Sequence, residues 1–395
     1  MKIIAILESL ITDGGGFNQA QNAILQMKRI CDGLCEFEVF TTKKENVKYL
    51  KALGISAEFY KYSILDRLIS ISFSSPFWQR VLNTLKISGH FENELEKHGA
   101  DLAYFPVTSR NSNKLQKLNY ITTVFDLCHR DSPEFPEVRN FWELHIREQF
   151  MHNSLAPALV VLTDSDQLSN RISARYGVDS ERLLSMPFSP SPFLDTNLST
   201  TKDSVLGIYD LKDGYFFYPA QLWAHKNHIR ILEALLILRE KGSEYTVVFA
   251  GGDQGNRAHL ERFVAKHSLE GQVRFLGFVP ADHLRGLYEG STAVIMPTYF
   301  GPTNLPPLEA WMIGKPLIYS SHLQAGVGDA AICVNPDEPG ELAEAMVACN
   351  DPGTRTNLVK AGHLRLKEVE QQRTKAELKL KEILVRFSAR RRCWA

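Results

Sequence analysis

Short apolar runs alternate with longer segments of helical period along most of the 395-residue chain. The runs are apolar at successive positions and end at Gly, Pro or Asp, a pattern that favours parallel strands covered by helices on both faces. We predict strands at residues 2–7, 38–40, 102–105, 121–125, 159–162, 215–218, 246–250, 273–275, 293–296, 316–319 and 332–334. Helices are predicted between them, among others at 16–30, 227–241, 257–267 and 306–313. This alternation predicts a doubly wound α/β fold.

A polar stretch at residues 187–213, rich in Ser and Pro at its start, interrupts the alternation. A fresh strand begins after it, so we predict two Rossmann-like domains, at residues 1–200 and 201–372, that face one another across a cleft. The chain length fits two domains of roughly 100–200 residues each. Residues 373–395 are predicted as a C-terminal helix and basic tail, and we hypothesise that this segment packs back on the first domain.

Lys plus Arg and Asp plus Glu number 45 each, so the formal net charge is zero. This balance gives no electrostatic argument for nucleic acid as a partner, because such binding depends on clustered basic residues. None of the six cysteines forms a CxxC pair, which favours reduced thiols over a zinc or redox site. No apolar run approaches the ~20 residues needed to cross a bilayer. We expect a cytoplasmic protein, and the basic residues 390–392 motivate the hypothesis of peripheral association with the inner membrane.

The first of three motifs, Asp-Gly-Gly-Gly-Phe-Asn at residues 13–18, follows the first predicted strand. Gly15 and Gly16 allow the backbone to approach a ligand closely, and the start of the next helix presents free N–H groups to an anion. The motif is not GxGxxG and no GxxxxGK[ST] loop occurs in the chain, so a simple tight turn stays open as the alternative.

The second motif, Tyr-Pro-Ala-Gln-Leu-Trp-Ala-His-Lys-Asn-His at residues 218–228, opens the first long helix of the second domain. Lys226 lies near the start of that helix, where the dipole already favours anions, and this combination indicates a diphosphate site. A solvated lysine is the alternative. Asn227 is predicted to cap the helix. His225 and His228 have no acidic or cysteine partner nearby in the sequence, so no metal site is predicted.

The third motif, at residues 297–310, joins a strand to a helix through a loop rich in Pro and Gly. A loop after the carboxyl end of a strand faces the ligand crevice in sheets of this kind. Its backbone N–H groups can bind phosphate, and Glu309 can accept hydrogen bonds from ribose hydroxyls. The alternative is that Glu309 is a surface residue that compensates the helix dipole.

The ordered motifs resemble the family 4 retaining glycosyltransferases of GT-B fold. The resemblance is strong over residues 214–365 and looser over 1–200, and it is supported by the stretches 249–252, 273–279 and 309–316. The pattern Phe-Gly-Pro-Thr-Asn-Leu-Pro-Pro-Leu-Glu resembles a branch of mannosyltransferases that build bacterial surface polysaccharides. GT-B proteins consist of two doubly wound Rossmann-like domains, which agrees with the prediction from the strand pattern.

The resemblance implies roles for individual residues of the second domain. Lys226 would neutralise the donor diphosphate, and Glu309 would hold the ribose. The remaining implied donor contacts come from the first glycine loop, the position five residues before the lysine, the base-binding stretch and the third motif: Gly15, Gly16, Gln221, Phe278, Val279, Thr303, Asn304 and Leu305. Two positions depart from the family pattern, because Gln221 replaces an arginine and Gly301 replaces the first glutamate of Glu-x7-Glu.

In the first domain the resemblance implies an acceptor site at Asp126, His129 and Arg130, which follow a predicted strand. Phe125 stands where the family usually has histidine. Asp126 and His129 are predicted catalytic residues, together with Lys226 and Glu309. A structural role is the alternative for His129.

The function implied is hexosyl transfer with retention of configuration, in bacterial lipopolysaccharide, O-antigen or capsule biosynthesis. The donor would be a nucleotide-sugar, with GDP-mannose as first choice, and the acceptor a glycan or lipid-linked oligosaccharide. No metal and no resident cofactor are expected, and other polysaccharide-assembly enzymes are candidate partners. Two alternatives are a catalytically silent nucleotide-sugar-binding assembly partner and, with less support, a sugar-nucleotide epimerase.

Overall fold

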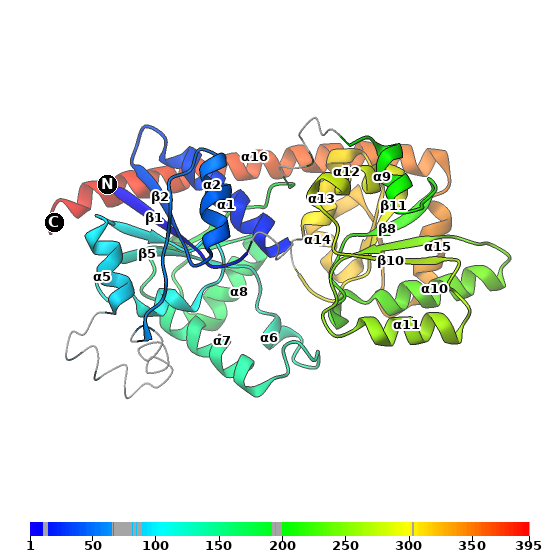
Figure 1. Cartoon of the computed structure of the whole chain (residues 1–395), viewed down its shortest axis with the longest axis horizontal. Helices are drawn as coiled ribbons and strands as arrows, with labels where there is room; N and C mark the ends of the chain where they lie inside the picture. The colour runs from blue at the N-terminus through cyan, green and yellow to red at the C-terminus, as the bar shows by residue number, and fades with distance from the viewer. Residues whose placement is uncertain are drawn as a thin grey trace. The chain divides into compact units, whose positions relative to one another are not determined.

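The computed structural model describes residues 1–10, 15–64, 66, 81, 84, 89–191, 194, 200–301 and 304–394 (Figure 1). Contacts between Cα atoms divide the chain into two compact units. Unit 1 comprises residues 1–129, 140–188 and 372–395, and unit 2 comprises residues 130–139 and 189–371. Residues 130–139 therefore group with unit 2, although the chain on both sides of them belongs to unit 1.

The described strands of unit 1 form one parallel sheet in the order β3-β2-β1-β4-β5-β6-β7. These strands are β1 (Lys2–Leu7), β2 (Glu36–Thr41), β3 (Ala57–Phe59), β4 (Leu102–Tyr104), β5 (Asn119–Val124), β6 (Val160–Thr163) and β7 (Leu183–Ser185). The helices are α1 (Gly15–Cys31), α2 (Lys44–Ala52), α5 (His90–Lys97), α6 (Cys128–Asp131), α7 (Phe141–Ser154) and α8 (Asp166–Tyr176), with short 3-10 turns η1 (Arg110–Lys114) and η2 (Ser180–Arg182). The two outermost strands, β3 and β7, were not predicted.

Alternate residues of β1 point to opposite faces of this sheet, as the strand period of two requires. Ile3 and Leu7 join the buried cluster that contains the apolar face of α1, whereas Ile4 and Ile6 join a second cluster with residues of α5, α7 and α8. Both faces of the strand are thus covered, which is why its sequence is apolar without alternation.

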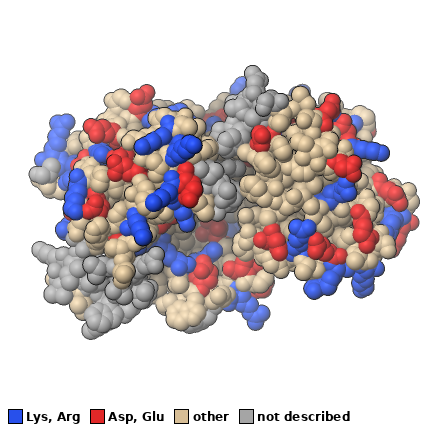
Figure 2. Space-filling view, viewed as in Figure 1, with Lys and Arg blue, Asp and Glu red and all other residues tan. Residues whose placement is uncertain are grey.

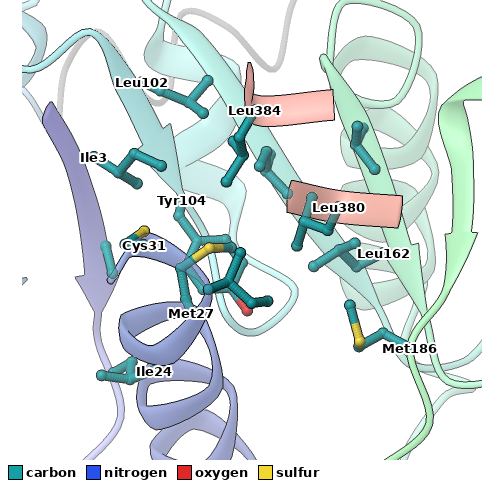
Figure 3. Close-up of a cluster of buried hydrophobic side chains, with 14 of the residues drawn as sticks. Ile3, Ile24, Met27, Cys31, Leu102, Tyr104, Leu162, Met186, Leu380 and Leu384 are labelled. Atoms are coloured by element: carbon teal, nitrogen blue, oxygen red, sulfur yellow. The ribbon is translucent and has the colours of Figure 1, made fainter. Parts of the chain in front are cut away.

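The long helix α16 (Pro352–Arg391) contributes to the first of these clusters. Leu380 and Leu384 pack with Leu102, Tyr104 and Leu162 of the sheet (Figure 3). One face of the helix, formed by Ala376, Leu380, Ile383, Leu384 and Phe387, is therefore part of the unit 1 core. Of the helices that lie within the described ranges, none has both the length and the apolar character that crossing a membrane requires.

The described strands of unit 2 form a second parallel sheet in the order β10-β9-β8-β11-β12-β13. They are β8 (Tyr215–Tyr218), β9 (Val247–Ala250), β10 (Val273–Gly277), β11 (Ser291–Met296), β12 (Leu317–Ser320) and β13 (Ile332–Val334). The helices are α9 (Lys202–Ile208), α10 (His228–Glu240), α11 (Arg257–Lys266), α12 (Ala281–Gly290), α13 (Leu305–Ile313), α14 (Gln324–Val327) and α15 (Pro339–Ala348), with 3-10 turns η4 (Ala224–Lys226), η5 (Ser321–Leu323) and η6 (Gly328–Ala330). Each unit is doubly wound, as predicted.

Candidate functional site

The carboxyl ends of β8 and β11 are neighbours in unit 2, because these strands pair in parallel with Phe217 opposite Val294. After β8 the chain continues to β9, which lies toward one edge of the sheet, and after β11 it continues to β12, which lies toward the other edge. A topological switch point therefore lies between β8 and β11. In doubly wound sheets, ligands bind outside the strand ends at such a point. The second and third sequence motifs follow these two strands, and the fold therefore brings them together.

Asn227 connects the loop after β8 to two other loops of unit 2. Its backbone φ is 58°, in the left-handed region where asparagine is enriched. The side-chain Nδ2 donates to the carbonyl oxygens of Pro297, at 3.0 Å, and Pro336, at 2.8 Å. Asn227 occupies the N-cap position of α10, as predicted, but its side chain makes no capping hydrogen bond and instead joins these loops.

Lys226 lies at the end of η4, immediately before α10. Its Nζ donates to Oδ1 of Asn304, at 3.0 Å. Asn304 is 8% exposed and directly precedes α13, and its Nδ2 donates to the carbonyl oxygen of Gly301 and to the hydroxyl of Tyr319. The ammonium therefore lies beside the N-terminus of α13, whose dipole adds positive potential for an anion.

Gly301 adopts a φ of 107°, which only glycine adopts readily. A Cβ atom at this position would lie 2.9 Å from Oδ1 and 3.0 Å from Nδ2 of Asn304. The space that a glutamate at position 301 would need is therefore partly filled by the amide that Lys226 contacts. This arrangement gives a physical reason for glycine at the position where the sequence departs from Glu-x7-Glu.

Glu309 lies on α13 and is 5% exposed, so the alternative of a surface glutamate is wrong. Its Oε2 accepts a hydrogen bond from the hydroxyl of Tyr288, at 2.6 Å, and the backbone of Ser191 also bonds to the carboxyl group. Burial raises the pKa of Glu309, while these two donors oppose the rise. The carboxyl group is thus an acceptor held inside unit 2.

The other implied donor residues of unit 2 are placed as follows. Thr303 lies outside the described residues, and Leu305 is the first residue of α13. After β10, the Phe278 side chain is exposed and that of Val279 is buried. Gln221 accepts a hydrogen bond from the indole N–H of Trp223, at 3.0 Å.

In unit 1, Asp126 and His129 follow β5. Asp126 Oδ1 accepts from the Cys128 amide at 3.0 Å and lies 3.6 Å from the Arg147 guanidinium. His129 is 1% exposed, and its Nε2 lies 2.8 Å from Oε1 of Glu148. Burial lowers the pKa of His129, so a neutral ring is favoured. The structure thus presents Asp126 to solvent more than His129.

The remaining first-domain candidates lie in different units. Gly15 and Gly16 are the first two residues of α1 in unit 1, and residues 11–14 before them lie outside the described ranges. Arg130 is exposed and groups with unit 2, whereas Asp126 and His129 group with unit 1. Nothing in the sequence indicates that Arg130 belongs to a different unit from Asp126 and His129.

Charged side chains of both signs are interspersed on the face shown in Figure 2, in keeping with the net charge of zero. Among the residues that the structure describes, no group of three or more His, Cys, Asp or Glu is placed to hold a metal ion. Near the switch point, the geometry places the Lys226 ammonium beside the N-terminus of α13.

Sequence reasoning missed two side chains at this site. Tyr288 on α12 donates to Glu309, and Glu137 contacts His225 beside Lys226. Glu137 lies 88 residues before His225 in a segment without helical or strand periodicity. A single sequence carries no local signal that joins such positions, because the contact is created by the fold.

Two doubly wound parallel units, one with a lysine and a buried carboxyl group at its switch point, define a protein of GT-B fold. HepE of Anabaena, in its complex with UDP and glucose, has this fold, with a TM-score of 0.70, 17% sequence identity, and coverage of 98% of this chain and 99% of HepE. The family model "Glycosyl transferases group 1" matches residues 205–365. The matched residues make up most of unit 2.

Curated relatives share moderate identity with part of the chain. O-antigen chain mannosyltransferase B of Escherichia coli is 27% identical over 223 residues, which span 55% of this chain and 58% of the relative. O-antigen chain mannosyltransferase RfbU of Salmonella typhimurium strain LT2 is 26% identical over 180 residues, which span 45% of this chain and 47% of the relative. The chain thus matches about half the length of these relatives.

Proposed function

We propose that the protein is a retaining glycosyltransferase that transfers a hexosyl group from a nucleotide-sugar to a glycan or lipid-linked acceptor in bacterial lipopolysaccharide, O-antigen or capsule biosynthesis. The observation that carries this proposal is the Lys226 ammonium, 3.0 Å from Asn304 at the N-terminus of α13 and at the switch point of unit 2. Mannose is the first sugar to test, because two relatives are O-antigen mannosyltransferases.

The proposed reaction breaks the bond between the anomeric carbon and the diphosphate oxygen of the donor. A hydroxyl oxygen of the acceptor bonds to that carbon from the same face, and its proton passes to the departing diphosphate oxygen. Negative charge grows on the leaving diphosphate, where Lys226 and the free N–H groups of α13 stabilise it. Glu309 would accept hydrogen bonds from the ribose hydroxyls. These would replace the hydrogen bonds that it accepts from Tyr288 and Ser191 in the ligand-free protein.

We propose that neither a metal ion nor a resident cofactor is needed, since the lysine and the helix N-terminus supply positive charge to the diphosphate. Asp126 is the proposed acceptor contact in unit 1. Peripheral association with the inner membrane would bring a lipid-linked acceptor to the enzyme. It is supported by the three consecutive basic residues Arg390, Arg391 and Arg392.

Thermal stability with UDP, GDP, dTDP, CDP, ADP and CMP, measured without metal, tests the donor site. A ligand at 100 times its dissociation constant adds about 2.7 kcal/mol to the free energy of unfolding, which shifts the midpoint visibly. One diphosphate should stabilise the protein and identify the donor base. Transfer from the matching nucleotide-sugar, in EDTA, is then followed by the anomeric proton signal of the product. Inverted configuration, or transfer only after a metal is added, contradicts the corresponding part of the proposal.

Gly301 and Gln221, where the chain departs from the family pattern, favour one second candidate, a member that binds a nucleotide-sugar without transferring the sugar. Stabilisation by a diphosphate without turnover, across the matching nucleotide-sugars and glycan acceptors, would support that candidate. Turnover with any donor excludes it.

A further inference from the structure

The turn that carries Lys226 contacts a segment from a distant part of the sequence. Glu137 belongs to residues 130–139, which group with unit 2. Its Oε1 accepts a hydrogen bond from the backbone amide of His225, at 3.0 Å, and also contacts Nδ1 of the His225 ring. The side chains of Glu137 and His225 are 9% and 11% exposed, so this contact is largely shielded from water.

The imidazole of His225 is fixed on several sides. Burial, and then the charge of Lys226, hold the pKa of His225 well below its usual range, so the ring is neutral near pH 7. A neutral imidazole donates from one nitrogen, and the carboxylate of Glu137 places that proton on Nδ1. Phe300 stacks on the ring with 3.8 Å between centroids and 14° between planes, and the edge of Phe135 approaches it at 6.4 Å.

The backbone of His225 links this contact to both loops of the proposed donor site. Its carbonyl oxygen accepts from the amide of Tyr299, at 2.9 Å, and from the hydroxyl of Thr298, at 3.3 Å. The next carbonyl, of Lys226, accepts from the hydroxyl of Tyr218, at 2.9 Å. Fixing His225 therefore fixes the start of the lysine side chain and the loop that leads to Gly301 and Asn304.

We propose that Glu137 is a positioning residue of the donor site: through His225 it orders the 224–226 turn and the 298–301 loop, so that the Lys226 ammonium is in place before a diphosphate binds. This inference rests on the proposed function of Lys226. A binding group that is already ordered does not lose conformational freedom when the ligand binds, so removing Glu137 should weaken binding without removing any ligand contact.

The variants Glu137→Ala, Glu137→Gln and Glu134→Ala separate the interaction from general effects. Alanine removes the acceptor, whereas glutamine keeps an oxygen that accepts from both the amide and Nδ1 of His225. Glu134 lies on the same segment and is exposed, so its replacement is a matched control. His225→Phe provides a second route, because it keeps the stack on Phe300 and removes the ring donor.

Hydrogen exchange of the ligand-free full chain is the first measurement. Glu137→Ala and His225→Phe should speed exchange of the Lys226 and Tyr299 amides about tenfold, while the Gln and Glu134→Ala variants exchange like the parent. Wild-type exchange in both Glu137→Ala and His225→Phe overturns the proposal.

Calorimetric titration with UDP and GDP is the second measurement. The diphosphate that binds the parent should bind Glu137→Ala about tenfold more weakly, and Glu137→Gln should restore its affinity. Unchanged affinity in Glu137→Ala overturns the positioning role. If the parent binds neither these two nor dTDP, CDP, ADP or CMP, although exchange is faster in Glu137→Ala, the ordering of the turn stands and the proposed donor function falls.

Discussion

Nζ of Lys226 lies 3.0 Å from Oδ1 of Asn304, so the lysine at the end of one loop is paired with the residue that begins the helix after the other loop. The amide is a neutral acceptor, and a diphosphate oxygen is an anionic one. Because hydrogen bonds to charged groups are stronger, an incoming diphosphate should replace Asn304 as the acceptor. The pair thus holds the ammonium in position without neutralising its charge.

Replacing Lys226 by methionine should weaken binding of the stabilising nucleoside diphosphate by roughly 10- to 100-fold. A hydrogen bond to a charged group contributes about 1.5–3 kcal/mol, which corresponds to this range. Isothermal titration calorimetry measures the change. Lys241→Met, at the exposed C-cap of α10, is the matched control and should bind like the parent. Equal affinities for all three proteins would remove Lys226 from the site.

Gly301→Ala should weaken diphosphate binding because the added Cβ displaces the Asn304 amide that contacts Lys226. Gly255 has a φ of 93°, similar to the 107° of Gly301, but a Cβ there meets no atom within 4 Å. Gly255→Ala therefore carries the backbone strain, of about 1–3 kcal/mol, without the collision. Both variants should lose stability in urea titration, and only Gly301→Ala should lose affinity. Equal affinity losses would assign the effect to strain alone.

Tyr288→Phe should reduce the free energy of unfolding by about 1–3 kcal/mol, because the buried carboxyl group of Glu309 loses a donor. Tyr245→Phe is a suitable control, since the structure shows no hydrogen bond to the Tyr245 hydroxyl within the described ranges. Denaturant unfolding, monitored through hydrogen exchange of the α13 amides, measures the free energy of unfolding of unit 2. A loss below 0.5 kcal/mol for Tyr288→Phe, similar to that of the control, would contradict the role given to the pair.

Stability should fall as the pH drops below about 6.5. Burial lowers the pKa of His228 to about 3, whereas an unfolded chain binds a proton at this side chain near pH 6.5. The unfolded state therefore gains protons first, and each such histidine costs up to about 1.4 kcal/mol of stability per pH unit below 6.5. His228→Gln should reduce this slope, measured by urea titrations of the parent and the variant at pH 7.0, 6.0 and 5.0. Equal slopes in both proteins would refute the assignment.

Leu384→Ala should destabilise unit 1 by about 2–5 kcal/mol, because Leu384 is fully buried against the sheet. Leu378→Ala, on the same helix, removes a side chain that is 59% exposed and should change stability by less than about 0.5 kcal/mol. Hydrogen exchange of the β1 amides measures both effects in unit 1. Slow, parent-like exchange in Leu384→Ala would show that this helix does not support the sheet.

Much of the fold could be predicted because both sheets are buried on two faces. The runs at β1, β8 and β13 are apolar throughout or nearly so, and their predicted bounds equal the observed ones. The edge strand β3 was missed because it contains only three residues, two of them exposed. The strand β7 is equally short and includes Ser185, so neither strand has the apolar run by which the others were recognised.

The candidate site was predictable in part for a related reason. Lys226 and Asn304 each follow a strand, and the switch-point rule places such loops together once the sheet order is known. The contacts within the site were not predictable in the same way. Asn227 has the residue type of a helix cap, but its amide bonds to Pro297 and Pro336, and only tertiary structure determines that choice.

The position of α16 in the core of unit 1 also constrains the order in which the two units can fold during synthesis. Leu380 and Leu384 leave the ribosome after all of unit 2, yet the hydrophobic cluster around Ile3 and Tyr104 needs them. Unit 1 therefore begins first and finishes last, after every segment of unit 2 has been made. Until residues 376–387 arrive, the apolar face that they cover is open to water and to chaperones.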